Sequence, residues 1–425
     1  MNTSSGTIRL ILILSFLSTG PLVVAETLSR DEAIRLAYQN NRELAIATLE
    51  ISRAASRLRW SGRLENPEFE ISRSGDGFGK DDDESVHEIG FTQKFPLTAK
   101  LKHEKNLRRY QVILAEAEIA EQHRELAGRV DLALVNLVAT REKMAVSREL
   151  VQLNLEIVNF LKKQAKEGLV SSLDVMQATL NGRTLEQQSK SLEALEKQNL
   201  LDLVEVIGLD ADTPVQAGTR FTVPGRKPGI NISLDTVLRQ RPDYVLALAK
   251  TDEAAAAVTL EEAKRWQDVS LRLFVEQEEA IDEPLGREGN TFTGFGISIP
   301  LPLRNRNQEG IELARINEEA AEKGVDAVRF RIRSECEEAF HRRSDSWELA
   351  RDASGEILDL AETNLEEFRK AYQQGQASLI QVQRAQEQVL ELKTASLEFV
   401  AEYERAAAQV RLATGAYPGL TTSSK

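Results

Sequence analysis

Aromatic residues and cysteine are scarce in this sequence, and both shortages limit the kind of fold it can adopt. Only 5% of the 425 residues are aromatic, whereas 28% are charged, a balance that argues against a thick globular core. The single cysteine, Cys336, cannot form a disulfide within the chain, which suits a reducing compartment or an exported protein without disulfides. Ala, Leu, Glu, Gln, Arg and Lys dominate instead, as in long helices and coiled coils. Helix is therefore predicted to be the majority state.

Basic charge and recognisable catalytic motifs are also lacking. The formal net charge of -13 argues against the basic surface that sequence-independent binding of nucleic acid requires. The sequence contains no nucleophile motif, no phosphate-binding loop and no methionine cluster. Its four histidines lack the spacing of metal ligands; they are His87, His103, His123 and His341. We therefore predict no enzyme, no cofactor and no metal site.

Hydrophobic runs are short throughout the sequence. Arg9 precedes an apolar run from Leu10 to Leu17, and Val23-Val24-Ala25 supplies the small residues that a signal peptidase reads. A membrane anchor is the alternative, but this run is shorter than the roughly 20 residues that a spanning helix needs. Residues 1–25 are therefore predicted to be a signal peptide, with no cysteine after the apolar run for lipid attachment. Since no later window approaches about 18 uninterrupted apolar residues, any membrane-spanning part would have to be built from strands.

Proline, which breaks helix interiors, is absent from residues 97–213 and 303–417. Each stretch is predicted to be helical with one interruption, at Lys166 to Ser172 in the first and Gln373 to Ser378 in the second. Glycine followed by serine at these points ends one helix and starts the next. Each stretch is therefore a predicted helical hairpin, whose first arm of about 65 to 70 residues would be about 100 Å long.

Heptad spacing supports coiled-coil packing of these hairpins. The seams are thin and rich in alanine, and the opposite faces are charged, so that neighbouring helices can approach closely while one side stays wet. Residues seven apart are Val130, Leu137, Met144, Val151 and Val158; Leu173 and Leu180; Ala194 and Leu201; and Val382, Val389, Ser396, Tyr403 and Val410.

Two segments with alternating apolar and polar residues precede each helical hairpin. Period two predicts strands with one apolar face, and their length of about 9 to 11 residues suits a tilted strand in a bilayer. The apolar positions are Phe69 and Ile71; Ile89, Phe91 and Phe95; Val269, Leu271, Leu273 and Val275; and Phe295, Ile297, Ile299 and Leu301.

Polar, glycine-containing loops are predicted between these strands, at Ser74 to Glu84 and at Glu278 to Asn290. Carboxylates at Asp81 to Glu84 could bind Ca²⁺, but they lack the spaced ligands and the fixed turn of an EF-hand loop. A solvated surface loop is the favoured interpretation.

The two halves of the sequence match each other in order and spacing, which indicates an internal duplication. Landmarks recur at offsets of 202, 206 and 207 residues: Asn66 to Ile71 with Asp268 to Leu273, Phe95-Pro96-Leu97 with Leu301-Pro302-Leu303, and Gly168 with Gly375. Upstream, Asn41-Arg42-Glu43-Leu44 corresponds to Arg241-Pro242-Asp243-Tyr244, each expected within a helix that leads into the first strand of its half.

A division of the chain follows from this duplication. After the signal peptide, the first repeat covers 26–208, with a helix, a β-hairpin at 66–96 and a helical hairpin at 98–208. A linker at 209–231 leads to the second repeat at 232–415, with a helix, a β-hairpin at 268–303 and a helical hairpin at 305–415. Residues 416–425 form a tail. The fold class is therefore mainly α with a β portion.

Four strands with one apolar face would leave two open edges in lipid, where unpaired backbone groups are not tolerated. Closure therefore requires several chains to share one barrel. Three chains would supply twelve strands, with their polar faces lining a wet lumen, and the helical hairpins would continue the tube on one side.

These features resemble the TolC-like outer-membrane efflux proteins over nearly the whole chain after residue 25. The resemblance rests on Asn40 to Leu44, Arg241-Pro242-Asp243, the turns at Gly168 and Gly375, and the helix restart at Leu173 to Ala178. Pro300 to Gln308, together with Glu65 to Phe69, is most similar to the CzcC-like cation-efflux branch of that family.

The resemblance implies a homotrimer with a twelve-stranded barrel in the outer membrane and an α-helical barrel in the periplasm. It further implies docking to a periplasmic adaptor (membrane fusion) protein and an inner-membrane RND pump, and passive export of heavy-metal cations or other small toxic solutes. By the same resemblance, the docking surface for the adaptor is formed by Gly168, Leu169, Val170, Ser171, Gly375, Gln376, Ala377 and Ser378. A purely structural role, with glycines permitting a left-handed turn and serines capping helices, is compatible with docking.

Family members often carry aspartates just past these turns as a constricting ring that attracts cations. Asp174 fits this pattern, but the equivalents in the second half are Gln381 and Arg384. This departure puts an acidic gate in doubt. Two alternatives remain: a latch between Asp174 and Arg384 on neighbouring helices, or two solvated surface charges.

Two other classes of protein are the rivals of an outer-membrane duct. A periplasmic coiled-coil adaptor usually has one helical hairpin, whereas this hairpin is duplicated, and a structural scaffold would not need strands of bilayer length. The sequence does not identify the exported solute or the partner pump.

Overall fold

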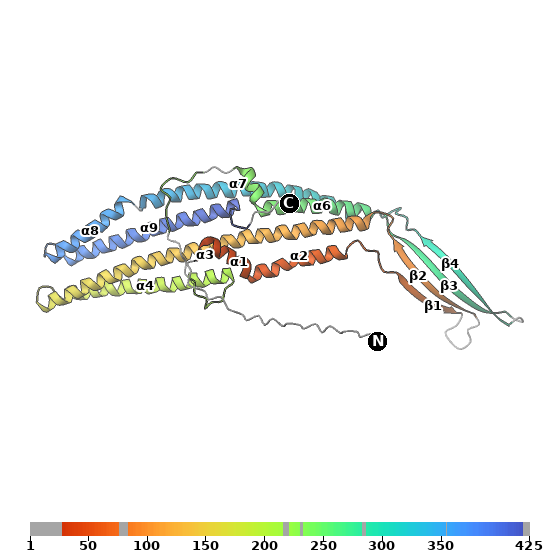
Figure 1. Ribbon diagram of the computed structural model, residues 1–425, viewed down its shortest axis with the longest axis horizontal. Helices are drawn as coiled ribbons and strands as arrows, with labels where there is room; N and C mark the ends of the chain where they lie inside the picture. Colours follow the sequence, from red (N-terminus) through yellow and green to blue (C-terminus); the bar gives the residue numbers. More distant parts are fainter. Residues whose placement is uncertain are drawn as a thin grey trace, which may run out of the picture.

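The chain folds into an elongated body, with a four-stranded sheet at one end and two long helical hairpins that reach away from it (Figure 1). The computed structural model describes residues 28–75, 84–215, 221–229, 233–282, 286–353 and 355–419. The predicted signal peptide and Asp81 to Asp83 lie outside these ranges. No helix within them combines the length and the apolar character that a membrane crossing requires.

The order of elements is repeated in the two halves. The first half contains α1 (Arg30–Asn40), α2 (Arg42–Trp60), β1 (Glu68–Gly75), β2 (Glu84–Phe95), α3 (Lys100–Lys166) and α4 (Ser172–Ile207). The second half contains α5 (Leu234–Gln240), α6 (Pro242–Ala263), β3 (Val269–Asp282), β4 (Gly286–Ser298), α7 (Gln308–Ala353), α8 (Glu356–Gln373) and α9 (Leu379–Thr414). Helix predominates among the described residues, as the composition predicts, and α7 and α8 together correspond to α3.

A break between α7 and α8 corrects the prediction of one unbroken first arm in the second hairpin. The backbone of Gly355 is not helical, with φ -104° and ψ -148°. Glycine within a helix is less stable than alanine by about 1 kcal/mol, because it loses more backbone freedom. α3 has no glycine after Gly128 and continues for 67 residues.

The predicted heptad seams differ in burial. All five α9 residues of the seam that starts at Val382 are buried, and four of the five α3 residues that start at Val130 are buried, with Val151 partly exposed. The α4 seam, in contrast, is exposed at Leu173, Leu180 and Leu201. The heptad spacing therefore marks a packed face in α3 and α9, and an uncovered one in α4.

The sheet is antiparallel, in the order β1-β2-β3-β4, and the pairing of β2 with β3 joins the two halves. Its register aligns the predicted apolar positions in rows, one of which runs across all four strands through Phe69, Phe91, Leu273 and Phe295. These side chains are exposed on one face. The period-two pattern is therefore confirmed as a single apolar face.

Glu278 to Asn290, predicted to be a loop, is mostly strand, which corrects the sequence analysis. β3 and β4 remain paired from Glu278 opposite Asn290 to Asp282 opposite Gly286. Polar residues are poor strand formers in isolation, but strand preference depends strongly on the pairing context. Ladder hydrogen bonds to an already paired neighbour therefore outweigh the composition here.

The helices form a layer of limited width. Near the sheet, α2 packs on α3, α3 on α6, and α6 on α7; toward the far turns, α4 packs on α3, α3 on α9, and α9 on α7 and α8. One edge of the chain therefore carries β1, α2 and α4, and the other carries β4, α7 and α8.

Candidate functional site: tips, edges and helix junctions

The two far turns, here called the tips, share one backbone geometry. Gly168 and Gly375 have φ values of 74° and 73°. In each tip, the N–H of the residue after the glycine donates to the carbonyl five residues back, at 2.9 Å in the first and 2.8 Å in the second. This is the Schellman motif, which needs a left-handed residue after the helix. No atom lies within 4 Å of a Cβ built at either glycine, so a larger side chain would meet no steric clash there. Glycine is required because of the left-handed backbone conformation.

The helices that leave the tips are capped locally. Ser171 Oγ accepts a hydrogen bond from the N–H of Leu173 at 3.1 Å. In the second tip, the N–H of Ser378 donates to Gln381 Oε1 at 2.8 Å. Gln381, a predicted gate residue, therefore also closes its own turn.

Both tips lie at the same end of the molecule (Figure 1). Buried Leu161 of α3 and Val382 of α9 belong to one apolar cluster, and Val170 packs against it. Burial raises the pKa of the Tyr372 phenol, and the negative charge of Asp174 raises it further, so Asp174 lies close to the end of α8. The fold thus gathers the residues predicted for docking onto one end surface.

The charges predicted for a gate are not joined within one chain. Asp174 is half-buried, and Arg384 is exposed. Among the ion pairs of the described residues, none links these two side chains. The predicted latch, if formed, needs another chain or a different arrangement of the tips. No group of three His, Cys, Asp or Glu side chains in the described ranges could hold a metal ion.

A buried polar layer behind the tips escaped the sequence analysis. Asn154 is 1% exposed, and both polar atoms of its side chain lack a hydrogen-bond partner among the described residues, as do both of Gln386. The ion pairs Lys143 with Glu398 and Lys393 with Glu149 align α3 antiparallel to α9, which sets these amides at one level. Polar residues at core heptad positions were the available signal.

Each of the edge helices α2, α4 and α7 has two apolar stripes on opposite sides of the helix. One stripe is buried within the chain and the other is exposed. In α2, Leu44 and Ala54 are buried in the chain, whereas Ile46, Leu49 and Trp60 are exposed on the other side of the helix. In α4, the predicted seam lies opposite the buried Ala178 and Leu185, and Met176 extends it. In α7, Leu313, Ile316 and Phe330 are exposed opposite the buried Ala314 and Ile332.

Equivalent junctions occur where the first two helices of each half meet. Asn41 separates α1 from α2, and Arg241 separates α5 from α6, so these residues lie at helix breaks, not within a helix as predicted. Asn41 Nδ2 donates to the carbonyl of Val206 at 3.0 Å, and Arg241 Nη1 donates to that of Ala413 at 2.8 Å. Each side chain thus binds a free carbonyl at the end of the returning helix, α4 or α9.

A glycine completes each junction. Gly208 and Gly415 have positive φ values of 86° and 71°. A Cβ at Gly208 would lie 2.4 Å from the Asn40 carbonyl oxygen, and one at Gly415 would lie 2.7 Å from that of Gln240. Both positions therefore require glycine for conformation and for close approach.

Charge is concentrated in the second junction. The Arg241 side chain is 1% exposed and contacts both Asp243 oxygens at 2.8 Å and Glu335 at 2.8 Å. Burial would raise the pKa of Asp243, but hydrogen bonds to Arg241 and its charge outweigh burial and hold that pKa below its usual range. Burial also raises the pKa of the Cys336 thiol.

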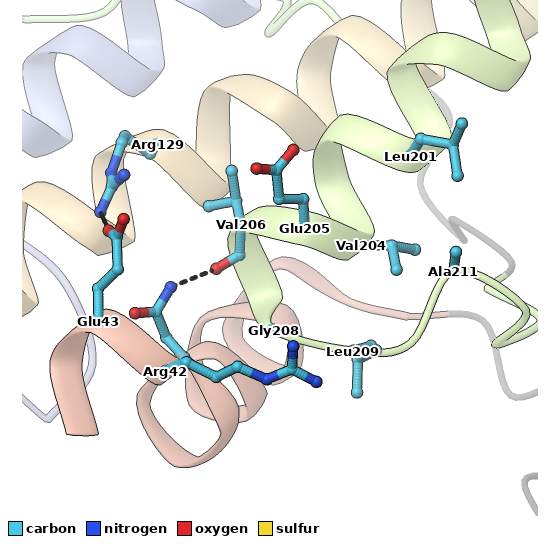
Figure 2. A pocket seen from close by; sticks show the side chains of 11 residues that line it. Arg42, Glu43, Arg129, Leu201, Val204, Glu205, Val206, Gly208, Leu209 and Ala211 are labelled. Carbon is cyan, nitrogen blue, oxygen red and sulfur yellow. Dashed lines mark hydrogen bonds and ion pairs between the residues drawn. The ribbon is translucent and has the colours of Figure 1, made fainter. Parts of the chain in front are cut away.

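The first junction, in contrast, is open on one side. A hollow of about 440 Å³ there is lined by Asn41 and the residues that Figure 2 labels. Figure 2 shows the contact between Glu43 and Arg129 at its rim, with Leu209 and Ala211 following Gly208 along its edge.

Known proteins match both the sequence and the fold. Residues 33–209 match the family model of outer membrane efflux proteins, whereas no curated protein matches the chain significantly. The fold is similar to VceC from Vibrio cholerae, with 17% identity over 91% of this chain and 96% of that one, at a TM-score of 0.68. It is also similar to CmeC from Campylobacter jejuni, with 18% identity, 98% and 93% coverage and a TM-score of 0.70.

A third structure is the open state of the Neisseria gonorrhoeae MtrE outer membrane channel, with 16% identity, 91% and 89% coverage and a TM-score of 0.71. At these identities the structural likeness establishes the fold, and the family match covers the first half of the duplicated chain. The family model therefore relates residues 33–209 to outer membrane efflux proteins, and the solved outer-membrane channels show the same fold over nearly the whole chain.

Proposed function

We propose that three copies of this chain close into one duct, which serves as the outer-membrane channel of a tripartite efflux system. The observation that carries this proposal is the pair of unfinished edges. β1 and β4 end the sheet, and α2, α4 and α7 each present an apolar stripe that nothing in the described chain covers. Since the two edges differ, copies must join head to tail, and such contacts close into a ring when the rotation between neighbouring copies closes.

In this assembly, β4 of one copy pairs with β1 of the next, and three copies give a twelve-stranded barrel. The exposed apolar face of the sheet would contact outer-membrane lipid, as the outward face of such a barrel requires. Helices in the order α2, α3, α6 and α7 would continue the wall as an α-helical barrel in the periplasm. We also propose the division into repeats at 26–208 and 232–415, with a linker at 209–231.

The tips are proposed to bind the periplasmic adaptor protein that connects the duct to an inner-membrane RND pump. Leu169 is a large exposed apolar residue on a rigid Schellman turn, which suits contact with a partner helix. Asp174, Gln381 and Arg384 are proposed to form the periplasmic gate. Replacing Arg384 with alanine should then raise single-channel conductance, and unchanged conductance would count against a latch.

The proposed cargo is heavy-metal cations or other small toxic solutes. On the polar face of the sheet, the register places Glu88 directly opposite Glu276, and Arg272 pairs with Glu70 and Glu88. The described side chains on this face include four further carboxylates and one further cation, Lys94; the carboxylates are Glu68, Glu84, Glu278 and Glu288. Such a lining favours positive solutes.

The test begins with the protein purified without residues 1–25. The duct requires detergent for recovery, a trimer mass in detergent and ion conductance in a planar bilayer; recovery as a soluble monomer without detergent would contradict it. Deleting the gene and comparing sensitivity to divalent metals with sensitivity to dyes and detergents distinguishes the two cargo classes.

A further inference from the structure

The second junction is covered on both flanks, whereas the first is covered on one. On one flank of the second junction, Arg124 of α3 donates to the Leu412 carbonyl at 2.8 Å. On the other flank, α7 supplies Arg331, which donates to Asp243 at 3.0 Å, and Cys336, whose thiol contacts the Ala413 carbonyl at 3.4 Å. The second junction is therefore enclosed between two long helices.

The first junction has α3 on one flank, through the pair between Arg129 and Glu43 at 3.7 Å. The hollow of about 440 Å³ lies beside this pair, with Arg129 and Glu43 at its rim. Apolar side chains reach this hollow from the end of α4 and the turn after it, including Leu201, Leu209 and Ala211 (Figure 2). By the internal duplication, α7 corresponds to α3, so the open flank of the first junction corresponds to the flank that α3 covers at the second junction. In a ring of copies, α7 of a neighbouring copy would take that place.

One exposed side chain of α7 has the size and position to fill this space. Phe330 is 74% exposed, the highest value for a large apolar residue on any described helix. It directly precedes Arg331, which reaches the second junction. The buried Ile332 lies on the opposite side of α7, so Phe330 belongs to the exposed stripe. Phe330 is therefore at junction height and directed away from its own chain.

The two junctions lie at the same height along the molecule, because both contact one short stretch of α3, at Arg124 and at Arg129. When copies stand side by side with β4 next to β1, α7 of one copy reaches the open flank of the next at this height. We propose that Phe330 inserts into the first-junction hollow of a second copy and completes that site.

The boundary between the halves within the chain has a comparable fit. A Cβ at Gly128 of α3 would lie 2.7 Å from a Leu412 methyl group, so Leu412 occupies the space that a side chain at Gly128 would take. In the proposed contact between chains the arrangement is reversed: the side chain that fills the space, Phe330, belongs to the long helix α7, and the space that it fills is at the first junction. In the proposed contact, Arg329 and Arg333, which flank Phe330 in the sequence, would lie near the carbonyl end of the neighbour's α4, where positive charge is favourable.

This proposal rests on the proposed ring of copies, so the experiment measures assembly and contact separately. In a Cys336→Ala background, Phe330→Cys is combined with Leu209→Cys and treated with a short bismaleimide in detergent. The expected result is a ladder of linked dimers and trimers on denaturing gels. The control pairs Phe330→Cys with Leu180→Cys and should give no ladder, because Leu180 lies on the exposed stripe of α4 about 40 Å toward the tip from the end of that helix.

Each outcome is decisive. A trimer mass without a ladder for the 330 and 209 pair, or equal ladders for both pairs, would overturn the Phe330 contact while leaving the duct intact. A monomer in the Cys336→Ala parent would overturn both. As a second measurement, Phe330→Ala should raise the trimer dissociation constant by about 100-fold or more, whereas Leu169→Ala, at a tip residue that is 66% exposed, should leave it unchanged.

Discussion

Replacing Arg241 with methionine should destabilise the chain severely, because it removes one partner of a buried ion pair. Asp243, only 6% exposed, would keep Arg331 at 3.0 Å as its partner, and that arginine is itself largely exposed. The Ala413 carbonyl would also lose its donor at 2.8 Å. Breaking a buried pair by removing one charge costs about 3–5 kcal/mol, so we expect a loss of that size in the free energy of unfolding.

The double variant Arg241→Met with Asp243→Leu separates the ion pair from the rest of the side chain. It removes both charges, and a buried pair replaced by apolar residues is often neutral. The remaining loss should be about 1–3 kcal/mol, because the Ala413 carbonyl keeps only the weak thiol donor of Cys336 at 3.4 Å. Arg239→Met is the matched control, because this exposed arginine donates only to a neighbouring backbone carbonyl at 3.2 Å.

The assay is denaturant unfolding in detergent at fixed protein concentration, since assembly contributes to apparent stability. A loss below about 1 kcal/mol in Arg241→Met, or a double variant as unstable as the single one, would refute the reasoning. The pH dependence gives a second measurement. The pKa of Asp243 is lowered in the folded chain, so its stabilising effect is present above the unfolded value of about 3.9 and is lost as pH falls through the folded pKa.

Three further changes test other parts of the fold. Gly208→Ala should destabilise by at least twice as much as Gly168→Ala, because both have positive φ but only the former would place a Cβ 2.4 Å from a backbone oxygen; thermal unfolding compares them, and equal losses would contradict this. Burial raises the pKa of Glu404, so Glu404→Gln should stabilise the chain at pH 7, with a gain that disappears below about pH 4 in pH-dependent unfolding. Gln386→Met removes two unpartnered buried atoms beside Asn154 and should raise the unfolding free energy by about 1–3 kcal/mol; a lower midpoint in urea would show that the amide has a partner.

Local, periodic signals explain what the sequence could predict. The alternation around Phe69 and Leu273 reports on one face of a strand, and the pleat converts it directly into an apolar surface. The stretches without proline predict where a helix continues, and the glycines at 168 and 375 predict where the backbone turns. None of these inferences needs knowledge of a distant contact.

The features that escaped prediction depend on partners. The seam of Leu173 and Leu180 has heptad spacing, but spacing does not tell whether the partner helix belongs to the same chain. The strand at Glu278 to Asp282 owes its structure to its neighbour in the sheet, not to its composition. The burial of Arg241 arises from three helices that meet there, although the pairing of Gly208 with Gly415, again 207 residues apart, was a readable sign of the junction.

The unequal enclosure of the two junctions has a consequence for how the protein matures. A newly exported single chain already possesses every group that locks the second half, so that region can reach its final rigidity alone. The first half reaches it only when a neighbour arrives, and amide hydrogen exchange around Asn41 should slow on assembly far more than exchange around Arg241. In the ring, each copy would thus make the first junction of its neighbour rigid by covering it with α7.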